Sequence, residues 1–319
     1  MSTPLHVWIV FNAVVVALLS VDMFFFQRKA HAIRLGEALG WSAFWIALAL
    51  LFNLSLYFFP EAYGIPRAES GRYALEFLTG YIVEESLSMD NLFVFLMIFS
   101  YFQVPPAYRH KTLFWGILGA MVMRAAFILL GVALIQRFEW IIYVFGAILI
   151  VSGIRMGMKH GAELHPESNP VLIVLRKLVP VTRDYEGGRF FVRREGRLWG
   201  TPLLVTLVAI EASDLMFAID SIPAVLGITR HPFIAYSSNV CAILGLRSLF
   251  FALAGLMGMF RFLNYGLVAI LVFVGAKMLL HDFIPVSTGV SLGVIAGALA
   301  ASIGASLLLP ESDEPRPEA

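Results

Sequence analysis

Long apolar runs, each long enough for a helix that crosses a bilayer, alternate with short polar stretches along the 319-residue chain. A bilayer core about 30 Å thick needs about 20 apolar residues in a helix. Runs of this length lie at about 5–26, 38–59, 75–101, 112–134, 140–157, 201–227, 239–258, 265–281 and 286–309. The pattern predicts an all-α polytopic membrane protein with about nine transmembrane helices.

Composition supports a membrane protein and excludes several other classes. Hydrophobic residues make up 59% of the chain and charged residues 14%, whereas soluble domains carry about 25% charge. The net charge of +1 gives no signal for nucleic-acid binding. Because Cys241 is the only cysteine, an intramolecular disulfide is excluded. Basic residues follow the first apolar run rather than precede it, which favours an uncleaved first span with its N-terminus outside.

The distribution of lysine and arginine predicts the orientation. With the N-terminus outside, the inside loops hold 15 basic residues and the outside loops hold 4, counted between the nine runs. The positive-inside rule therefore favours a cytoplasmic C-terminus. Nine of the 15 lie in residues 155–200, where "RFFVRREGRLW" has the alternation of a small hairpin.

The second half of the chain repeats the first. Glu84 lies six residues before Asp90, and Asp214 lies six residues before Asp220. "ILGAMVMRAAF" resembles "ILGLRSLFFAL", with Arg124 and Arg247 inside the spans. "FGAILIVSGIRMGMKH" resembles "LVAILVFVGAKMLLHD". Spans 3–5 thus repeat as spans 6–8, and the predicted orientation inverts the second copy. A 3+3 inverted repeat is typical of secondary transporters.

The repeat divides the chain into five predicted parts. Two N-terminal helices occupy 1–74, the two three-helix repeats occupy 75–157 and 201–283, a basic cytoplasmic loop occupies 158–200, and a last helix with an acidic tail occupies 284–319.

Six carboxylates lie inside the two motif-bearing spans. They are Glu84, Glu85, Asp90, Glu211, Asp214 and Asp220. Left unpaired, they would cost roughly 15–20 kcal/mol on insertion scales. They must therefore be paired, protonated, hydrated or bound to a cation. Internal pairing with Arg124 and Arg247 is the structural alternative, but it leaves at least two acids in each repeat without an arginine.

Helical spacing groups these side chains. Residues seven apart share a face, as Glu84 does with Asn91 and Asp214 with Ser221. Glu211 and Asp214 are also neighbours, whereas Asp90 and Asp220 lie about 120° from that stripe. Pro223 removes a backbone donor, so we expect the helix over 201–227 to kink or open near it.

The donor types indicate which ligand the acids would bind. Carboxylate, amide and hydroxyl oxygens are hard ligands that suit Mg²⁺, Ca²⁺ or Mn²⁺. The predicted metal ligands are Asp90, Asp220, Glu84, Asp214, Glu211, Asn91 and Ser221. Arg124 and Arg247 are interpreted as supports that form ion pairs with the carboxylates. No bound cofactor is expected beside the transported ion. The sequence is compatible with a homo-oligomer.

The sequence resembles the TerC family of bacterial membrane proteins, in its Alx type. The resemblance rests on "FLTGYIVEESLSMDNLFVF" (77–95), "FSYFQVPP" (99–106), "EASDLMFAIDSIPAV" (211–225), "SSNVCAILGLRSLFF" (237–251) and "VFVGAKMLLHDF" (272–283). It implies manganese export, a link to tellurium resistance and a fold related to LysE-like exporters. Glu85 departs from the pattern, since relatives can carry lysine there, and is the weakest of the acidic candidates.

Three functions are compatible with the sequence. The first is export of Mn²⁺ through the carboxylate site. The second is a membrane scaffold in a metal- or tellurium-resistance assembly, without transport. The third is export of an amino acid or a tellurium oxyanion, which the excess of acids disfavours. A soluble-type enzyme is not expected, because the chain has no serine–histidine–aspartate set, P-loop or dinucleotide motif.

Overall fold

The structure is a computed structural model that describes residues 3–27, 35–158, 170–194, 196–254, 262–280, 282–283 and 286–308. Some side chains within these ranges, including those of Asp90 and Arg247, lie outside the description. The helices are α1 (Leu5–Gln27), α2 (Leu35–Phe58), α3 (Ser70–Tyr101), α4 (Pro106–Arg137), α5 (Ile141–Met158), α6 (Pro170–Leu178), α7 (Pro202–Leu226), α8 (Pro232–Ala254), α9 (Leu263–Leu279) and α10 (Thr288–Leu308), with short 3-10 turns η1 (Pro60–Tyr63) and η2 (Arg67–Glu69).

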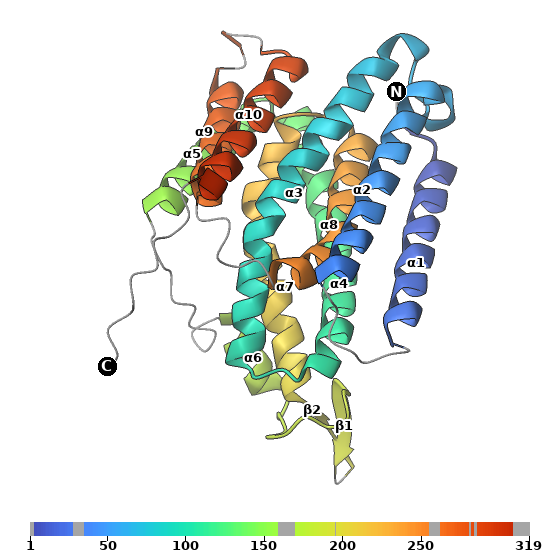
Figure 1. Ribbon diagram of the computed structural model, residues 1–319, viewed down its shortest axis with the longest axis vertical. Helices are drawn as coiled ribbons and strands as arrows, with labels where there is room; N and C mark the ends of the chain where they lie inside the picture. Colours follow the sequence, from blue (N-terminus) through green and yellow to red (C-terminus); the bar gives the residue numbers. More distant parts are fainter. Residues whose placement is uncertain are drawn as a thin grey trace.

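Four helices form the centre of the bundle (Figure 1). In it, α3 packs against α8 and α7, and α4 packs against α7 and α8. Helices α1 and α2 cover one side, where α2 contacts α8 and α3. Helices α5, α9 and α10 pack together on the other side, and α10 also reaches α3. Prolines stand at the first position of α4, α6, α7 and α8, where a missing backbone donor costs no helical hydrogen bond.

Several helices are long and apolar enough to cross a membrane. Five such stretches occur in the described residues: Gly36–Phe58, Pro106–Arg137, Ile141–Met158, Pro202–Leu226 and Thr288–Ser306. Shorter apolar stretches lie in α1, α8 and α9. The chain is therefore a multi-pass helical membrane protein, and the count of nine spans stays a prediction. Helices α3 and α4 have 32 residues each, about 48 Å, so they reach beyond a 30 Å hydrocarbon core.

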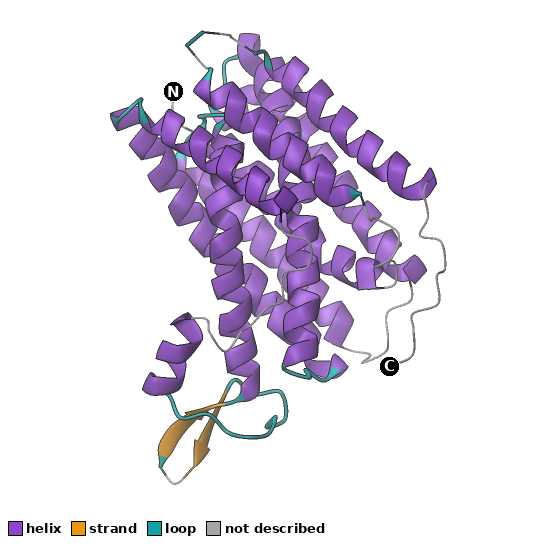
Figure 2. Cartoon of the chain, turned by 90° about the vertical axis from the view of Figure 1, so that its left-hand side faces the viewer, coloured by secondary structure: helices purple, strands orange, loops and turns teal. Residues whose placement is uncertain are grey.

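The segment 158–200 holds more structure than the sequence indicated. The predicted hairpin is confirmed: β1 (Phe191–Arg194) pairs antiparallel with β2 (Arg197–Gly200). Helix α6 was missed, because its nine residues are too few to be recognised as a span. Hydrogen bonds from Tyr185 Oη to the Phe102 carbonyl, 2.7 Å, and from Lys111 Nζ to the Gly188 carbonyl, 2.7 Å, tie the segment to α3 and α4. Figure 2 shows α6 and the hairpin together at one end of the bundle.

The structure corrects two expectations about the helices. The span expected at 239–258 begins earlier, at Pro232, because the polar residues at 237–239 are fully buried inside the bundle and do not end a helix. The helix over 201–227 does not open near Pro223, since every residue from Pro202 to Leu226 is α-helical, and the alternative of a kink there stays a prediction. Pro223 stands in the last turn of α7, where the helix ends before further bonds are lost.

Candidate functional site

Arg124 lies at the centre of the bundle with no exposed surface. Its guanidinium donates to both oxygens of Asp214, with Nη2–Oδ1 at 2.9 Å and Nε–Oδ2 at 3.3 Å. Nη1 donates to Glu84 Oε1 and, at 3.3 Å, to Ser221 Oγ. One arginine on α4 therefore joins a carboxylate of α3 to a carboxylate of α7.

Helical spacing explains how these groups reach one arginine. Asp214 and Ser221 are seven residues apart on α7, so both face Arg124. Ser88, one turn beyond Glu84 on α3, donates to Glu84 Oε1 at 3.2 Å. Sequence reasoning missed Ser88, although its spacing of four from Glu84 was a usable signal. Glu84 Oε2 is buried without a hydrogen-bond partner among the described residues.

Glu211 lies one turn before Asp214 and is half-buried. It rests against Gly119 of α4, where an added Cβ would stand 2.6 Å from the Glu211 carboxyl carbon. A larger residue at position 119 would therefore have to displace this carboxylate. No ion pair involves Glu211 in the described part of the chain.

Asp220 points away from Arg124, as its position off the helical stripe predicts. Its Oδ1 accepts a hydrogen bond of 2.6 Å from Ser152 Oγ of α5. Sequence reasoning missed Ser152, which is a lone hydroxyl in an apolar run. Asp220 is half-buried, and its neighbours Met216 and Ile219 are exposed at 66% and 54% in the isolated chain. This face of α7 is thus the more open one.

Glu85 follows Glu84 in the chain but faces another helix. An added Cβ at Gly245 of α8 would lie 3.6 Å from Glu85 Oε1. Glu85 Oε2 is buried without a hydrogen-bond partner in the described residues. Glu85 therefore has no described contact with the Arg124 cluster, and its lower rank among the acidic candidates stays a prediction.

The remaining candidates are not brought to the cluster by any described contact. Asn91 is buried, at 3% exposure, and the side chains of Asp90 and Arg247 lie outside the described residues. Within the described residues, no group of three acidic, histidine or cysteine side chains is close enough to hold a metal ion. The described acids are therefore an arginine-bridged pair, Glu84 and Asp214, the half-buried Glu211 and Asp220, and the buried Glu85 beside α8.

A second polar network lies at the end of the bundle opposite the hairpin. Glu76, 3% exposed, accepts from Arg72 Nε at 2.8 Å and from Thr229 Oγ1 at 2.6 Å. The Thr229 hydroxyl accepts from the backbone N–H of His231 at 3.2 Å. The network ties the start of α3 to the connection between α7 and α8.

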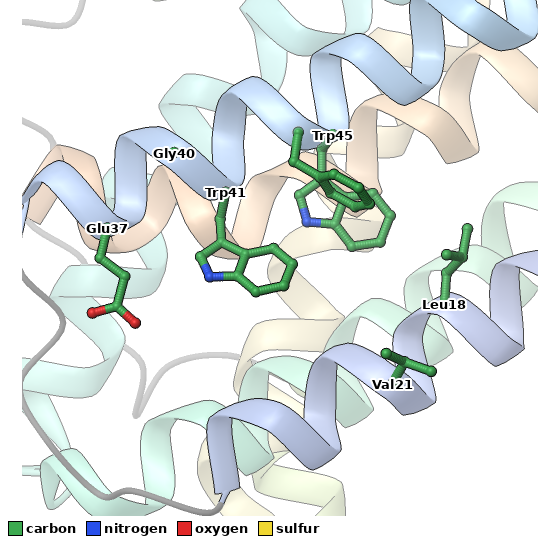
Figure 3. Close-up of a pocket in the computed structure, with 7 residues that line it drawn as sticks. Leu18, Val21, Glu37, Gly40, Trp41 and Trp45 are labelled. Carbon is green, nitrogen blue, oxygen red and sulfur yellow. The ribbon is translucent and has the colours of Figure 1, made fainter.

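A cavity of about 380 Å³ lies between α1 and α2, and none of its described lining residues belongs to the Arg124 cluster. Figure 3 shows Trp41 and Trp45 of α2 opposite Leu18 and Val21 of α1. Glu37 is the one acid among the lining residues whose side chains are described. Trp45 in its lining and the buried Glu85 carboxylate both lie within 4 Å of the position of an added Cβ at Gly245 of α8, so one wall of the cavity is near this acid.

These features define a multi-pass helical membrane protein with several carboxylates in its interior. The chain matches the Integral membrane protein TerC family over residues 69–314, and it belongs to that family. It is 46% identical over 317 residues to "Uncharacterized membrane protein STKORF319" of Myxococcus xanthus, covering 98% of this chain and 96% of that protein.

Two further relatives, from Salmonella typhi and Escherichia coli (strain K12), are both named "Putative membrane-bound redox modulator Alx". They are 45% and 44% identical, each over 293 residues, covering 91% of this chain and 90% of each relative. The resemblance to Alx-type members of the family is thereby confirmed. No solved structure matches the chain.

Proposed function

We propose that the protein exports a divalent metal cation, with Mn²⁺ as its substrate. The proposal rests on the observation that acidic side chains outnumber basic ones in the interior of α3 and α7. Glu84, Glu85, Glu211, Asp214 and Asp220 are described within α3 and α7, and Arg124 is the only cation that ion-pairs with any of them in the described residues. Because an uncompensated charge is costly inside a bilayer, such a site favours a mobile cation or protons.

The packing of α5 against α9 supports the proposed inverted repeat. Aligning 145–160 with 267–282 makes Val268 the counterpart of Gly146 and Gly275 the counterpart of Gly153. An added Cβ at Gly146 would meet the Gly275 carbonyl oxygen at 2.9 Å, and one at Gly153 would meet the Val268 carbonyl oxygen at 3.4 Å. A two-fold operation that exchanges the two helices converts the residue pair Gly146–Gly275 into the pair Val268–Gly153, so the same two levels of the helices are in close contact in both pairs.

The central helices show the same relation. If α3, α4 and α5 correspond to α7, α8 and α9, the contact of α3 with α8 becomes the contact of α7 with α4, and both occur. In this scheme Asp220 and Asp90 are equivalent ligands near the middle of the bilayer, where inverted-repeat transporters bind their substrates. Glu84, Glu211 and Asp214, with Asn91 and Ser221, complete or gate the site.

The choice of Mn²⁺ rests on the family resemblance, because the oxygen donors alone favour a hard divalent cation in general. The protein would lie in the bacterial inner membrane, with its N-terminus outside and the hairpin in the cytoplasm. The name of the Alx relatives refers to redox modulation. The only cysteine here, Cys241, is buried and cannot form a disulfide within the chain.

The alternative is a membrane scaffold without transport. It draws support from α6, which presents Ile173, Val174 and Leu178 at 43–75% exposure in a basic segment. A scaffold would depend on this surface and not on the buried acids. Deletion of residues 170–200 with metal tolerance fully retained would exclude it.

The deciding experiment measures manganese efflux from cells that carry Asp220→Asn or Asp90→Asn. We expect either substitution to abolish efflux at normal abundance in the membrane, because each removes one carboxylate ligand. Glu139→Gln, at an exposed acid between α4 and α5, is the matched control and should export normally. Wild-type efflux in both aspartate variants would contradict the proposal.

A further inference from the structure

The position of the Arg124 guanidinium resembles that of a bound cation more than that of a peripheral support. Four of its hydrogen bonds reach oxygens on two different helices: two on Asp214, one on Glu84 and one on Ser221. Its side chain is completely buried, as is that of Glu84, while that of Asp214 is 5% exposed. Water therefore does not separate the charges, and the guanidinium fills the space between them.

The oxygens around the guanidinium would also suit a metal ion. Glu84 and Asp214 supply carboxylates, Ser221 supplies a hydroxyl, and Ser88 stands 3.2 Å from Glu84 Oε1. Hard divalent cations bind six or more oxygens of these types. Arg124 brings one positive charge to two carboxylates, whereas a divalent cation would neutralise both. In a low-dielectric interior this difference strengthens the attraction of the two carboxylates for the metal, which opposes the cost of removing its hydration shell.

We propose that Arg124 is a built-in substitute for the transported metal, so that the guanidinium and a divalent cation occupy the Glu84–Asp214 site alternately. The inference rests on the proposed function and adds its mode of exchange. Without such a substitute, the empty site would hold two unpaired buried carboxylates, which is a costly state for a carrier to pass through.

The structure also offers the displaced guanidinium another partner. Glu211 lies three residues before Asp214 on α7 and rests against Gly119, which lies five residues before Arg124 on α4. Its carboxylate has no ion pair in the described part of the chain and is half-exposed. In the proposed exchange Arg124 turns from Asp214 toward Glu211 as the metal enters, so that the buried charge stays compensated.

Exchange of this kind separates two transport activities. Net export requires the empty protein to return to its starting state, and the return depends on Arg124 replacing the metal. Exchange of manganese for manganese keeps the site loaded and does not need the arginine. A residue that only supported the fold would affect both activities together.

The test uses the full-length protein in liposomes, with Arg124→Gln compared with wild type. Radioactive manganese reports binding by equilibrium dialysis, net efflux and manganese–manganese exchange. We expect binding to tighten by about tenfold or more, since the metal no longer displaces charge-assisted hydrogen bonds. Net efflux should fall by about tenfold or more. The empty protein must then return to its starting state while the Glu84 and Asp214 carboxylates lack the hydrogen bonds that the guanidinium donates. Manganese–manganese exchange should be retained. Arg137→Gln, at the exposed end of α4, is the control and should match wild type.

Each outcome bears on one of the two proposals. Unchanged or weaker binding in Arg124→Gln, beside measurable binding in wild type, overturns the role of Arg124. Wild-type protein that neither binds nor moves manganese overturns the proposed function instead. If Arg124→Gln does not fold, Arg124→Lys serves as the test variant. A lysine ammonium cannot donate hydrogen bonds to two carboxylates in the fixed geometry of a guanidinium, so the metal displaces it more easily. It should bind manganese more tightly than wild type, and equal or weaker binding overturns the inference.

Discussion

At the scale of single residues, one step along α3 separates two different environments. Glu84 meets Arg124 of α4, and Glu85 lies beside Gly245 of α8. Successive residues of a helix are rotated by 100°, so adjacent acids cannot share a partner. The sequence could rank Glu84 above Glu85 because only Glu84 has a counterpart in Asp214. It could not indicate that one arginine holds both counterparts, since that depends on how α3, α4 and α7 meet.

His231 provides a residue-scale prediction at the end of the bundle opposite the hairpin. Burial lowers its pKa, against an opposing effect of Glu69, and its ring lies 4.9 Å from that of Tyr73. The folded state therefore favours neutral histidine. Its contribution to stability is present above the unfolded pKa of about 6.5 and is lost as pH falls below that value.

We expect wild type to lose thermal stability relative to His231→Gln as pH falls from about 7.5 to about 5. Unfolding temperatures of the two proteins in detergent, measured across this range, check the prediction. The difference between them should change steadily with pH below about 6.5. A constant difference would show that protonation of His231 is not linked to folding.

At the scale of helices, the crossing of α5 and α9 depends on glycine. An added Cβ at Gly275 would lie 2.7 Å from the Gly146 carbonyl oxygen and 3.1 Å from the Ile150 backbone nitrogen. Backbone atoms cannot rotate away, so Gly275→Ala should lower the free energy of unfolding by about 1–3 kcal/mol. Thermal unfolding in detergent should show a drop of several degrees.

Gly293→Ala is the matched control, because no described atom lies within 4 Å of the position of its added Cβ. It should be neutral or slightly stabilising, as alanine is the better helix former. Equal destabilisation by both substitutions would mean that helix propensity, and not the close approach of α5 and α9, sets the effect.

The helices themselves could largely be predicted, and their contacts could not. Apolar runs located every long helix, because burial in lipid requires about 20 apolar residues. Helix α6 was not predicted, because a short amphipathic helix packs through a few residues, such as Leu172, and needs no long apolar run. Ser152 was not predicted, because its hydrogen bond depends on α5 lying beside Asp220 of α7. Spacing along one helix predicts a shared face, whereas partners on other helices depend on the packing of the bundle.

At the scale of the whole molecule, the predicted orientation places the two ends of the bundle on opposite sides of the membrane. The hairpin with α6 lies at one end, and the turn η1 lies at the other (Figure 1). Basic residues are concentrated in the segment that carries the hairpin. The positive-inside rule therefore places the hairpin in the cytoplasm and η1 outside.

Single-cysteine labelling in intact cells tests this orientation. Leu198 of the hairpin is 58% exposed and Glu61 of η1 is exposed, whereas the native Cys241 is buried and should contribute little background. A membrane-impermeant maleimide should label Glu61→Cys in intact cells and Leu198→Cys only after permeabilisation. The reverse pattern would show that the orientation in the membrane is inverted. Labelling of both positions from outside would contradict the placement of the two ends across one bilayer.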